Sequence, residues 1–376
     1  MRQTSRARDA KALSLFTGMP VELASEAVRT SEGEPLIPEA NADQRLFEQW
    51  VVRRICWPSN SPIYPWGIKY VYPRPDGLTI AVEGDNMAPE LANTLVPRYD
   101  PITGEVYGVP GCRITETGRH GLVLHLLDTD ATIHIIGIHR KAWRSGLGET
   151  DQELCHAGLR LCTHERPHEW TAAELAYTAR PWRRATHSDA DWNTAWLASG
   201  LLRRIGLLRT MGIPLYTTAW TNPVGIGQQW ILETQYQPQA ARASSHHETF
   251  LHLLNNEAWG LGLDWTDSHC TCETEYSNQC TFTGRPRLEQ AGELQLRFPR
   301  RTAERASRLL ANPQDYEAHR RIAVRVPARF SPPARIPSKL WPASEATPGG
   351  PEGERPSGKS PTLRATIRPL VTLCPN

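Results

Sequence analysis

The spacing of hydrophobic residues predicts a first amphipathic helix over residues 42–56. Leu46, Trp50, Val51 and Ile55 fall there close to helical spacing, so their side chains share one face. Residues 1–40 are polar and Glu-rich, with little periodicity. We therefore expect this N-terminal segment to be poorly ordered and the folded part of the chain to begin near residue 41.

From residue 62 to residue 140 the hydrophobic runs become short and are separated by turn residues, a pattern typical of β-strands. The pair Asp76-Gly77 favours a tight hairpin turn. A second turn lies near residues 128–131. The strands expected around these two turns span residues 68–72 with 78–82, and residues 122–127 with 132–138.

Pairing that is symmetric about the second turn sets two pairs of histidines opposite each other: His125 with His134, and His120 with His139. Two carboxylates occupy the turn itself. Imidazole and carboxylate groups together can bind a divalent metal or share a proton. Alternatively, histidines on facing strands simply pack against each other. The candidate catalytic residues of this hairpin are His125, His134, Asp128 and Asp130.

A metal-dependent nuclease is the enzyme alternative that these residues suggest. The segment from Asp76 to Glu83-Gly84-Asp85 resembles the PD-(D/E)xK nuclease pattern, in which two carboxylates hold Mg²⁺ and a Lys positions the attacking hydroxide. Asp85 stands where that Lys belongs, and the interval from Asp76 to Glu83 is short. The sequence contains no phosphate-binding P-loop, no nucleophile elbow and no zincin helix.

The middle of the chain has the pattern of three helices followed by a strand, a Gly-rich turn and a second strand. Thr171 and Glu174 form a capping box, in which the hydroxyl and the carboxylate each accept a hydrogen bond from a free backbone amide at the helix start. Trp192, Trp196 and other apolar residues form one stripe of the third helix. The expected helices span residues 151–162, 171–179 and 189–205, and the hairpin spans residues 214–233.

This order of elements, with segment 171–176 (Thr-Ala-Ala-Glu-Leu-Ala) followed by segment 200–208, resembles the winged helix-turn-helix superfamily of DNA-binding domains over residues 150–236. The resemblance implies that the third helix enters the major groove of double-stranded DNA. The connection over residues 180–188 is longer than the usual tight turn, which puts the register of that helix in doubt. The alternative is that these are ordinary packed helices of an α+β fold.

The same resemblance implies a set of DNA contacts. Asn193 and Thr194 would lie near bases. Arginines around the helices would neutralise phosphates, which is the sequence-independent part of affinity for DNA. These arginines are Arg180, Arg183, Arg184, Arg203, Arg204 and Arg209.

Four soft ligands lie within twelve residues of one another later in the chain: His269, Cys270, Cys272 and Cys280. Thiolates and imidazoles at close spacing can hold Zn²⁺. The Cys-x-Cys-x7-Cys spacing is not that of a standard zinc finger, and the acidic neighbours are equally consistent with a solvated loop. A second possible set of metal ligands is Cys155, Cys162, His164 and His168. Both of its cysteines lie in the expected helix 151–162, and if they pack in the core there they cannot also bind a metal.

Composition supports a globular protein: among 376 residues, 39% are hydrophobic, 22% are charged and 13 are Trp. No apolar run reaches the roughly 18 residues of a membrane helix, and no signal-peptide core follows the N-terminus. Eight scattered Cys favour reduced thiols or metal ligands over a disulfide framework. We expect a cytoplasmic location.

Arginine dominates the basic residues, since 37 of the 42 Lys and Arg residues are Arg. Arg suits contacts to phosphate, although a GC-rich genome produces the same bias without any functional cause. Ten Arg against three acidic residues give the segment 297–335 a net charge of +7.

Together these patterns predict an α+β protein in five parts. The expected function is DNA binding, as a regulator or as a replication or mobile-element factor. A non-catalytic interaction or scaffold protein, suggested by the abundant Trp and the tail, is the third class beside the nuclease. The parts are a poorly ordered segment (1–40), a β-rich domain (41–148), a winged-helix-like domain (149–236), an extension with the Cys cluster and a basic end (237–330), and a disordered Pro-rich tail (331–376).

Overall fold

A computed structural model describes residues 5–31, 33–56, 64–179, 189–210, 213–224, 227–237, 246–270, 279–287 and 292–299. All of them belong to one compact unit, Met1–Pro337. The boundaries predicted near residues 148 and 236 both fall inside this unit. The predicted tail (331–376) and most of the Arg-rich segment, from residue 300 onward, lie outside the described residues.

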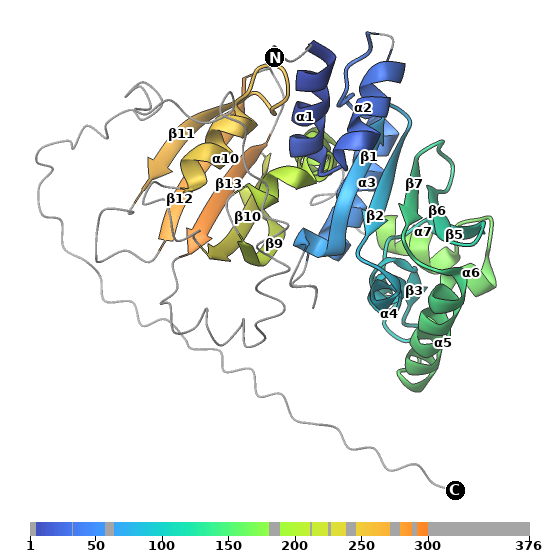
Figure 1. The fold of residues 1–376 in the computed structure, drawn as a ribbon. Helices are drawn as coiled ribbons and strands as arrows, with labels where there is room; N and C mark the ends of the chain where they lie inside the picture. The colour runs from blue at the N-terminus through green and yellow to red at the C-terminus, as the bar shows by residue number, and fades with distance from the viewer. Residues whose placement is uncertain are drawn as a thin grey trace, which may run out of the picture. The chain divides into compact units, whose positions relative to one another are not determined.

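The predicted fold class is confirmed, because helices accompany mixed and antiparallel sheets throughout the described part of the chain (Figure 1). The prediction for residues 1–40 is wrong. That segment contains two helices, α1 (Ser5–Thr17) and α2 (Val21–Thr30). Helix α1 lacks a periodic pattern because it buries residues on more than one side, among them Leu13, Leu15 and Phe16. Its burial is decided by contacts with distant elements, which local periodicity does not encode.

The first five-stranded sheet has the order β1-β2-β7-β6-β5. Both predicted hairpins are present, one at residues 74–77 and one after β6. Strands β2 and β7 pair in parallel, while the other neighbours are antiparallel. The strands are β1 (Ile68–Arg74), β2 (Gly77–Val82), β5 (Cys112–Thr117), β6 (Gly121–Leu126) and β7 (Thr132–Ile136).

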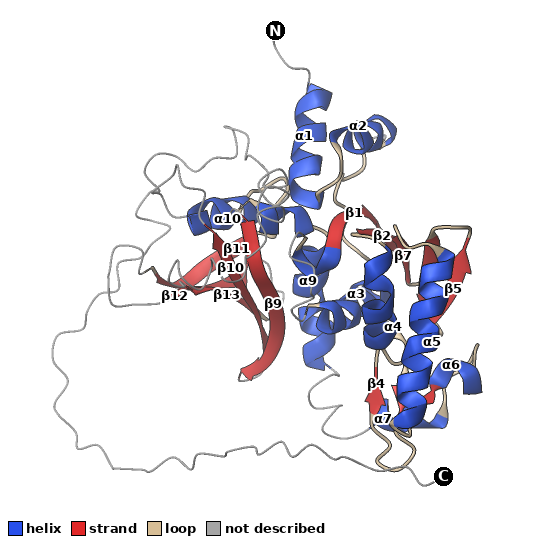
Figure 2. Ribbon diagram, turned by 60° about the horizontal axis from the view of Figure 1, so that its bottom comes forward, coloured by secondary structure: helices blue, strands red, loops and turns tan. Residues whose placement is uncertain are grey.

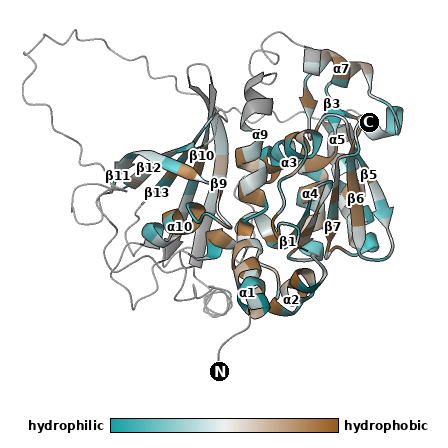
Figure 3. Cartoon of the chain, turned by 90° about the horizontal axis from the view of Figure 1, so that it is seen from above, coloured by the Kyte–Doolittle hydropathy of each residue, from teal (hydrophilic) through white to brown (hydrophobic). Residues whose placement is uncertain are grey.

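Alternation along these strands separates a buried face from a partly exposed one. Leu122, Leu124 and Leu126 of β6 are buried, as are Ile133 and Ile135 of β7, whereas the residues between them are half-exposed. The hydropathy colours in Figure 3 show the apolar segments of β6 and β7. Helices that carry the remaining core are α3 (Ala42–Ile55), α4 (Ala88–Leu95) and α5 (Arg140–His156).

Helix α3 matches its sequence prediction to within one residue. Asn41 caps its start, because the Asn41 side-chain oxygen accepts a hydrogen bond from the Gln44 amide at 2.9 Å. Two polar residues of this helix, Gln44 and Glu48, are fully buried. Gln44 contacts the sheet through Thr132, whose amide donates to the Gln44 side-chain oxygen at 2.8 Å.

The second five-stranded sheet has the order β11-β12-β13-β10-β9. Strand β10 pairs with β9 in an antiparallel hairpin and with β13 in parallel. Helix α10 (His246–Leu254) packs on this sheet through Phe250, which contacts Phe298. The strands are β9 (Ile213–Val224), β10 (Gly227–Gln237), β11 (Leu263–His269), β12 (Gln279–Pro286) and β13 (Glu293–Pro299).

Helix α9 (Asp189–Leu202) connects the two sheets, because it packs against α3 and also contacts β10 (Figure 2). A second connection joins the end of α3 to β9. The Cys56 thiol donates to the Ala219 carbonyl at 2.8 Å, and the Ala219 amide donates to the Cys56 carbonyl. Packing of α9 against α3 runs across the boundary predicted near residue 148, and the pairing of β10 with β13 runs across that near residue 236.

The central helices differ from the predicted order. Helix α5 begins at Arg140, eleven residues before the predicted start, and it is followed by β8 (Arg160–Leu161) and a short helix, α6 (Cys162–Glu165). Strand β8 pairs with β3 (Arg98–Tyr99), which also pairs with β4 (Val106–Tyr107). Helix α7 (Ala172–Ala179) is present as predicted. Among the described residues, no helix is both long enough and apolar enough to span a membrane.

Candidate functional site

An exposed basic surface lies on the first sheet, where the β5–β6 turn meets the start of α5. We define the basic surface by the residues that line its shallow depression: Glu116, Gly118, Arg119, His139, Arg140, Lys141 and Arg144. The four cationic side chains are exposed. Glu116 is the one carboxylate among the lining residues. Four cations and one anion give the basic surface a net charge of +3.

The backbone of two elements sets the position of these cations. The Arg140 amide donates to the Arg119 carbonyl at 2.9 Å, which ties the start of α5 to the β5–β6 turn. His139 caps the helix, because its Nδ1 accepts from the Lys141 amide at 3.1 Å. Asp85 in turn accepts from the His139 amide at 2.6 Å. Basic residues therefore occupy the first turn of α5, which contains no acidic residue.

Glu116 holds two of the arginines together. Its carboxylate lies 2.5 Å from Arg140 Nε and 2.9 Å from Arg144 Nε. The hydrogen bond to Glu116 and the charge of that carboxylate raise the pKa of Arg144. Conversely, the hydrogen bond from Arg144, aided by both positive charges, lowers the pKa of Glu116. The pairs are exposed and so add little stability, but they bring two guanidinium groups to one side of the surface.

Several predicted DNA contacts lie inside the protein instead. Thr194 is fully buried, and Arg203 and Arg209 are 1% and 6% exposed. Arg203 pairs with Glu48 at 2.7 Å. Side chains in these positions are shielded from solvent and cannot contact a DNA phosphate in this conformation. The prediction that they lie at a DNA interface is therefore corrected. Arg180, Arg183 and Arg184 lie outside the described residues, as does the side chain of Asn193.

Arg204 is half-buried and borders a cavity that opens to solvent beside Glu39 and Arg287. Its Nε donates to the Trp259 carbonyl at 2.6 Å and its Nη1 to the Gly200 carbonyl at 3.2 Å. Burial, and secondarily the nearby charge of Arg203, lowers its pKa to about 10. The cavity has a volume of about 260 Å³ and is bordered by four arginines together with Glu39 and Trp196. Duplex DNA does not fit a cavity of this size.

The hairpin that the resemblance assigns to a wing belongs to a larger sheet. Strands β9 and β10 pair over Ile213 to Val224, and β10 is also paired with β13. A wing needs a hairpin that projects from its helices, whereas here one edge of the hairpin is occupied by the rest of the sheet. The sequence could not show this, because the parallel partner β13 lies about sixty residues further along the chain.

The hairpin histidines pair in a different register from the predicted one. His134 lies opposite Val123, and His125 lies opposite Thr132. The shift of two residues keeps both histidines on one face but makes them diagonal neighbours. His125 instead contacts the Thr115 hydroxyl at 3.0 Å. The rings of His120 and His139 do come together, with centroids 4.9 Å apart.

The carboxylates expected at a nuclease centre are also dispersed. Asp128 accepts a hydrogen bond from the Trp170 ring at 2.7 Å, and Asp130 is exposed. Asp76 and Glu83 flank opposite ends of β2, whose six residues span about 20 Å, too far for one metal ion. Among the described residues, the only group of three or more metal-ligating side chains with ligand atoms close together is elsewhere. The two predicted nuclease sites are therefore not assembled.

That group contains His247, Cys270 and Cys280, so the structure assembles two of the predicted zinc ligands. His269 is replaced by His247, which lies on α10 and had no recognisable motif around it. Cys272 and the side chain of Cys155 lie outside the description. Cys162 is buried, and His164 and His168 are exposed.

The basic surface itself was missed at the level of sequence. Its signal was present, since a strand that ends near residue 138 is followed at once by His139, Arg140, Lys141 and Arg144. Only the pairing of β5 with β6 adds Arg119 and Glu116 to these residues.

Comparisons with protein-family models, with curated proteins and with solved structures found no match.

Proposed function

We propose that this protein binds double-stranded DNA through the basic surface at the start of α5. The observation that carries the proposal is the convergence of four exposed cations, Arg119, Arg140, Lys141 and Arg144, around one depression. DNA carries one negative charge per 1.7 Å of helix axis, so a cluster of exposed cations gains affinity by displacing condensed counterions.

The chemistry of these side chains suits phosphate. Three of the four cations are Arg, whose planar guanidinium makes two parallel hydrogen bonds to phosphate oxygens. The positive end of the α5 dipole adds to the field at its first turn. Glu116 pairs with one side of the guanidinium groups of Arg140 and Arg144. Both arginine side chains nevertheless remain half-exposed, at 50% and 57%. Arg119 and Lys141 stand beside them.

The mode of binding proposed here is contact with the sugar-phosphate backbone. Such contacts position a protein on DNA without reading bases. The proposal therefore keeps the DNA-binding function suggested by the sequence but assigns the phosphate contacts to a different surface. A regulator or a replication or mobile-element factor is consistent with this mode of binding.

Salt-dependent binding of a fluorescent duplex, measured by anisotropy with the full chain, tests the proposal. If all four cations contact phosphates, the logarithm of the binding constant should fall with the logarithm of salt concentration with a slope of about −3 to −4. Lys141→Ala should weaken binding and reduce that slope by about 0.9. Arg144→Ala should weaken binding too.

Arg285→Ala supplies a matched control. Arg285 is an exposed arginine 2.5 Å from Glu293 on the second sheet, and it resembles Arg144 with Glu116 in its local chemistry. Binding by this variant should equal that of the unaltered protein. Absence of duplex binding at low salt, or equal losses in Arg144→Ala and Arg285→Ala, would contradict the proposed surface.

A further inference from the structure

Two cysteines face each other at the end of the β11–β12 hairpin where the connecting loop leaves β11 and enters β12. In this hairpin His269 pairs with Thr281. Extending the antiparallel register by one residue brings Cys270 opposite Cys280. Cys280 is the second residue of β12, and Cys270 directly follows the last residue of β11. The two thiols thus come from chain positions ten residues apart but from adjacent strands.

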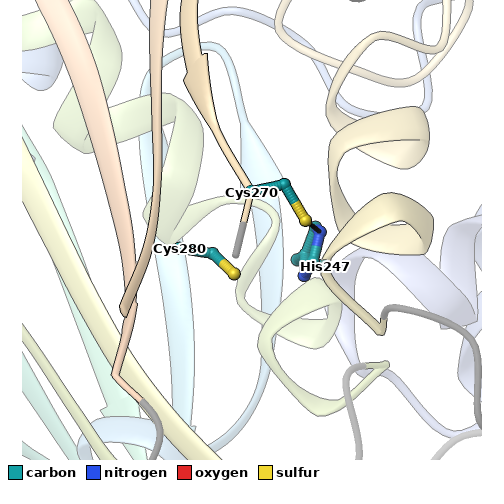
Figure 4. Close-up of side chains that lie close together, drawn as sticks. All are labelled: His247, Cys270 and Cys280. Carbon is teal, nitrogen blue, oxygen red and sulfur yellow. Dashed lines mark hydrogen bonds between the residues drawn. The ribbon is translucent and has the colours of Figure 1, made fainter. Parts of the chain in front are cut away.

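Helix α10 adds a third ligand-bearing side chain, because His247 lies in its first turn and points to the same place (Figure 4). The His247 Nε2 atom lies 3.4 Å from the Cys270 Sγ atom. One nitrogen or sulfur atom from each of the three residues lies within 4.8 Å of the others. Three different elements therefore converge on one point.

We propose that His247, Cys270 and Cys280 bind a Zn²⁺ ion. Zinc bonds of about 2.3 Å to sulfur and about 2.0 Å to nitrogen, in tetrahedral geometry, place the ligand atoms about 3.6 to 3.8 Å apart. The His247 Nε2 to Cys270 Sγ distance of 3.4 Å is close to these values, and no pair of ligand atoms is more than 4.8 Å apart, so side-chain movements of about 1 Å complete the site. The fourth tetrahedral position is left to a solvent molecule or a further donor.

Ligand chemistry selects the metal. Thiolate and imidazole are soft or borderline ligands that favour zinc over the hard cations Mg²⁺ and Ca²⁺. Each coordinating cysteine loses its proton to solvent when it binds zinc. Two thiolates and one neutral imidazole then balance the double positive charge of the ion. The resulting neutral cluster is compatible with the burial of His247 and Cys280, which are 1% and 2% exposed.

The surroundings of the site hold the imidazole in place. The His247 ring contacts Phe282 and Phe298, with centroid distances of 4.9 and 5.6 Å. These apolar rings restrict the motion of the imidazole and lower the local dielectric constant, which strengthens metal–ligand attraction. Cys270 is exposed, so the ion can enter from solvent on its side.

The same geometry explains why His269 is not a ligand although it is next to Cys270. Successive side chains of a strand point to opposite faces of the sheet. Cys280 shares the face of Phe282, which packs against His247, and the partner of His269 is Thr281, on the opposite face. The bound ion would fasten α10 to the end of the β11–β12 hairpin.

Metal analysis of the full chain, purified under reducing conditions without chelator, tests this site. Mass spectrometry of the elements should give one zinc per chain. Replacement by Co²⁺ should give the absorption of tetrahedral cobalt with a thiolate-to-cobalt charge-transfer band. Competition with a chromophoric chelator should show that Cys270→Ser binds zinc more than about 100-fold more weakly, since changes outside the ligand sphere alone cost about 10–100-fold.

Two histidine variants distinguish this ligand set from its neighbours. His247→Ala should lose zinc, and His269→Ala, at an exposed position, should keep it. Circular dichroism checks that each variant is folded, and Cys270→Ser covers the case in which His247→Ala does not fold, because Cys270 is exposed. Chelation should lower the melting temperature of the unaltered protein but not that of Cys270→Ser.

Three results would overturn the proposal. One is a purified chain without stoichiometric zinc that also binds none on titration. Another is loss of zinc in His269→Ala together with its retention in His247→Ala. The third is a disulfide between Cys270 and Cys280 in the reduced preparation, seen as a mass loss of two hydrogens in the intact protein.

Discussion

Arg203 and Glu48 form a doubly hydrogen-bonded ion pair in the interior, where Arg203 Nη2 lies 2.7 Å from Glu48 Oε1 and Nε lies 3.0 Å from Oε2. The pair joins α3 to the residue that directly follows α9. Ser199 and Gln44 each donate a further hydrogen bond to the Glu48 carboxylate. The charges are thus fully paired in a region without water access, which is the condition under which a buried ion pair is tolerated.

Breaking this pair should be costly. Arg203→Met leaves Glu48 as an unpaired buried charge, and we expect the free energy of unfolding in urea to fall by about 3–5 kcal/mol. The double variant with Glu48→Gln should lose less than the sum of the single variants, with a coupling energy of about 0.5–3 kcal/mol. Arg285→Ala, at an exposed pair, should change stability by at most about 1 kcal/mol. Equal effects at the two sites would contradict the buried role of Arg203.

A second buried carboxylate should make the protein sensitive to acid. Burial alone would raise the pKa of Glu174, but hydrogen bonds from Arg113 and from the Thr171 and Gly111 amides outweigh it, and the pKa is lowered. The folded state then binds fewer protons than the unfolded state, so stability rises with pH. This contribution is present above the unfolded pKa of about 4.3 and is lost as the pH falls through the lower folded value.

Glu174→Gln tests this assignment. The variant should be less stable at pH 7, because the amide is a poorer partner for Arg113, which is 3.0 Å from Glu174 in the unaltered protein. Its stability should also change less between pH 6 and pH 3 in urea titrations. A variant whose acid dependence matched that of the unaltered protein would show that other carboxylates dominate acid unfolding.

Reactivity of the thiols should follow burial. Burial raises the pKa of Cys56 and of Cys162 to about 12 and that of Cys112 further. At pH 8 their thiolate fraction is about 10³-fold below that of a free cysteine, whose pKa is about 8.5. Iodoacetamide labelling followed by peptide mass spectrometry should therefore modify exposed Cys270 of chelator-treated protein before these three buried cysteines. Labelling of Cys56, Cys112 and Cys162 should require denaturant, and rapid labelling of them in the native state would be inconsistent with their burial.

A glycine contact should be essential for docking α1. A Cβ atom on Gly206 would lie 2.5 Å from the Gly18 nitrogen and 2.5 Å from the Leu15 carbonyl oxygen, both backbone atoms. Gly206→Ala should therefore lower the free energy of unfolding by about 1–3 kcal/mol. Gly148→Ala is the control, because nothing lies within 4 Å of its Cβ position and its site in α5 favours Ala by about 0.5–1 kcal/mol. A neutral Gly206→Ala would mean that α1 does not approach this closely.

Local patterns in the sequence were sufficient to predict those elements that are determined by residues close together in the chain. Helix α3, the turn at Asp76-Gly77 and the capping box of Thr171 and Glu174 depend on residues at most a few positions apart. Each of these predictions is confirmed, and so is the α+β class. The wrong prediction for α1 has the opposite cause, because its residues are buried by distant partners on several sides.

The functional residues show the same division. The sequence by itself determined that arginines and clustered cysteines would be prominent, and that Cys270 and Cys280 were ligand candidates. Tertiary structure alone decided that Arg203 and Arg209 are internal, that Arg119 joins Arg140 and Lys141 at one surface, and that His247 rather than His269 meets the cysteines. The physical reason is that exposure and ligand geometry depend on strand register and helix docking, which bring together residues far apart in the chain.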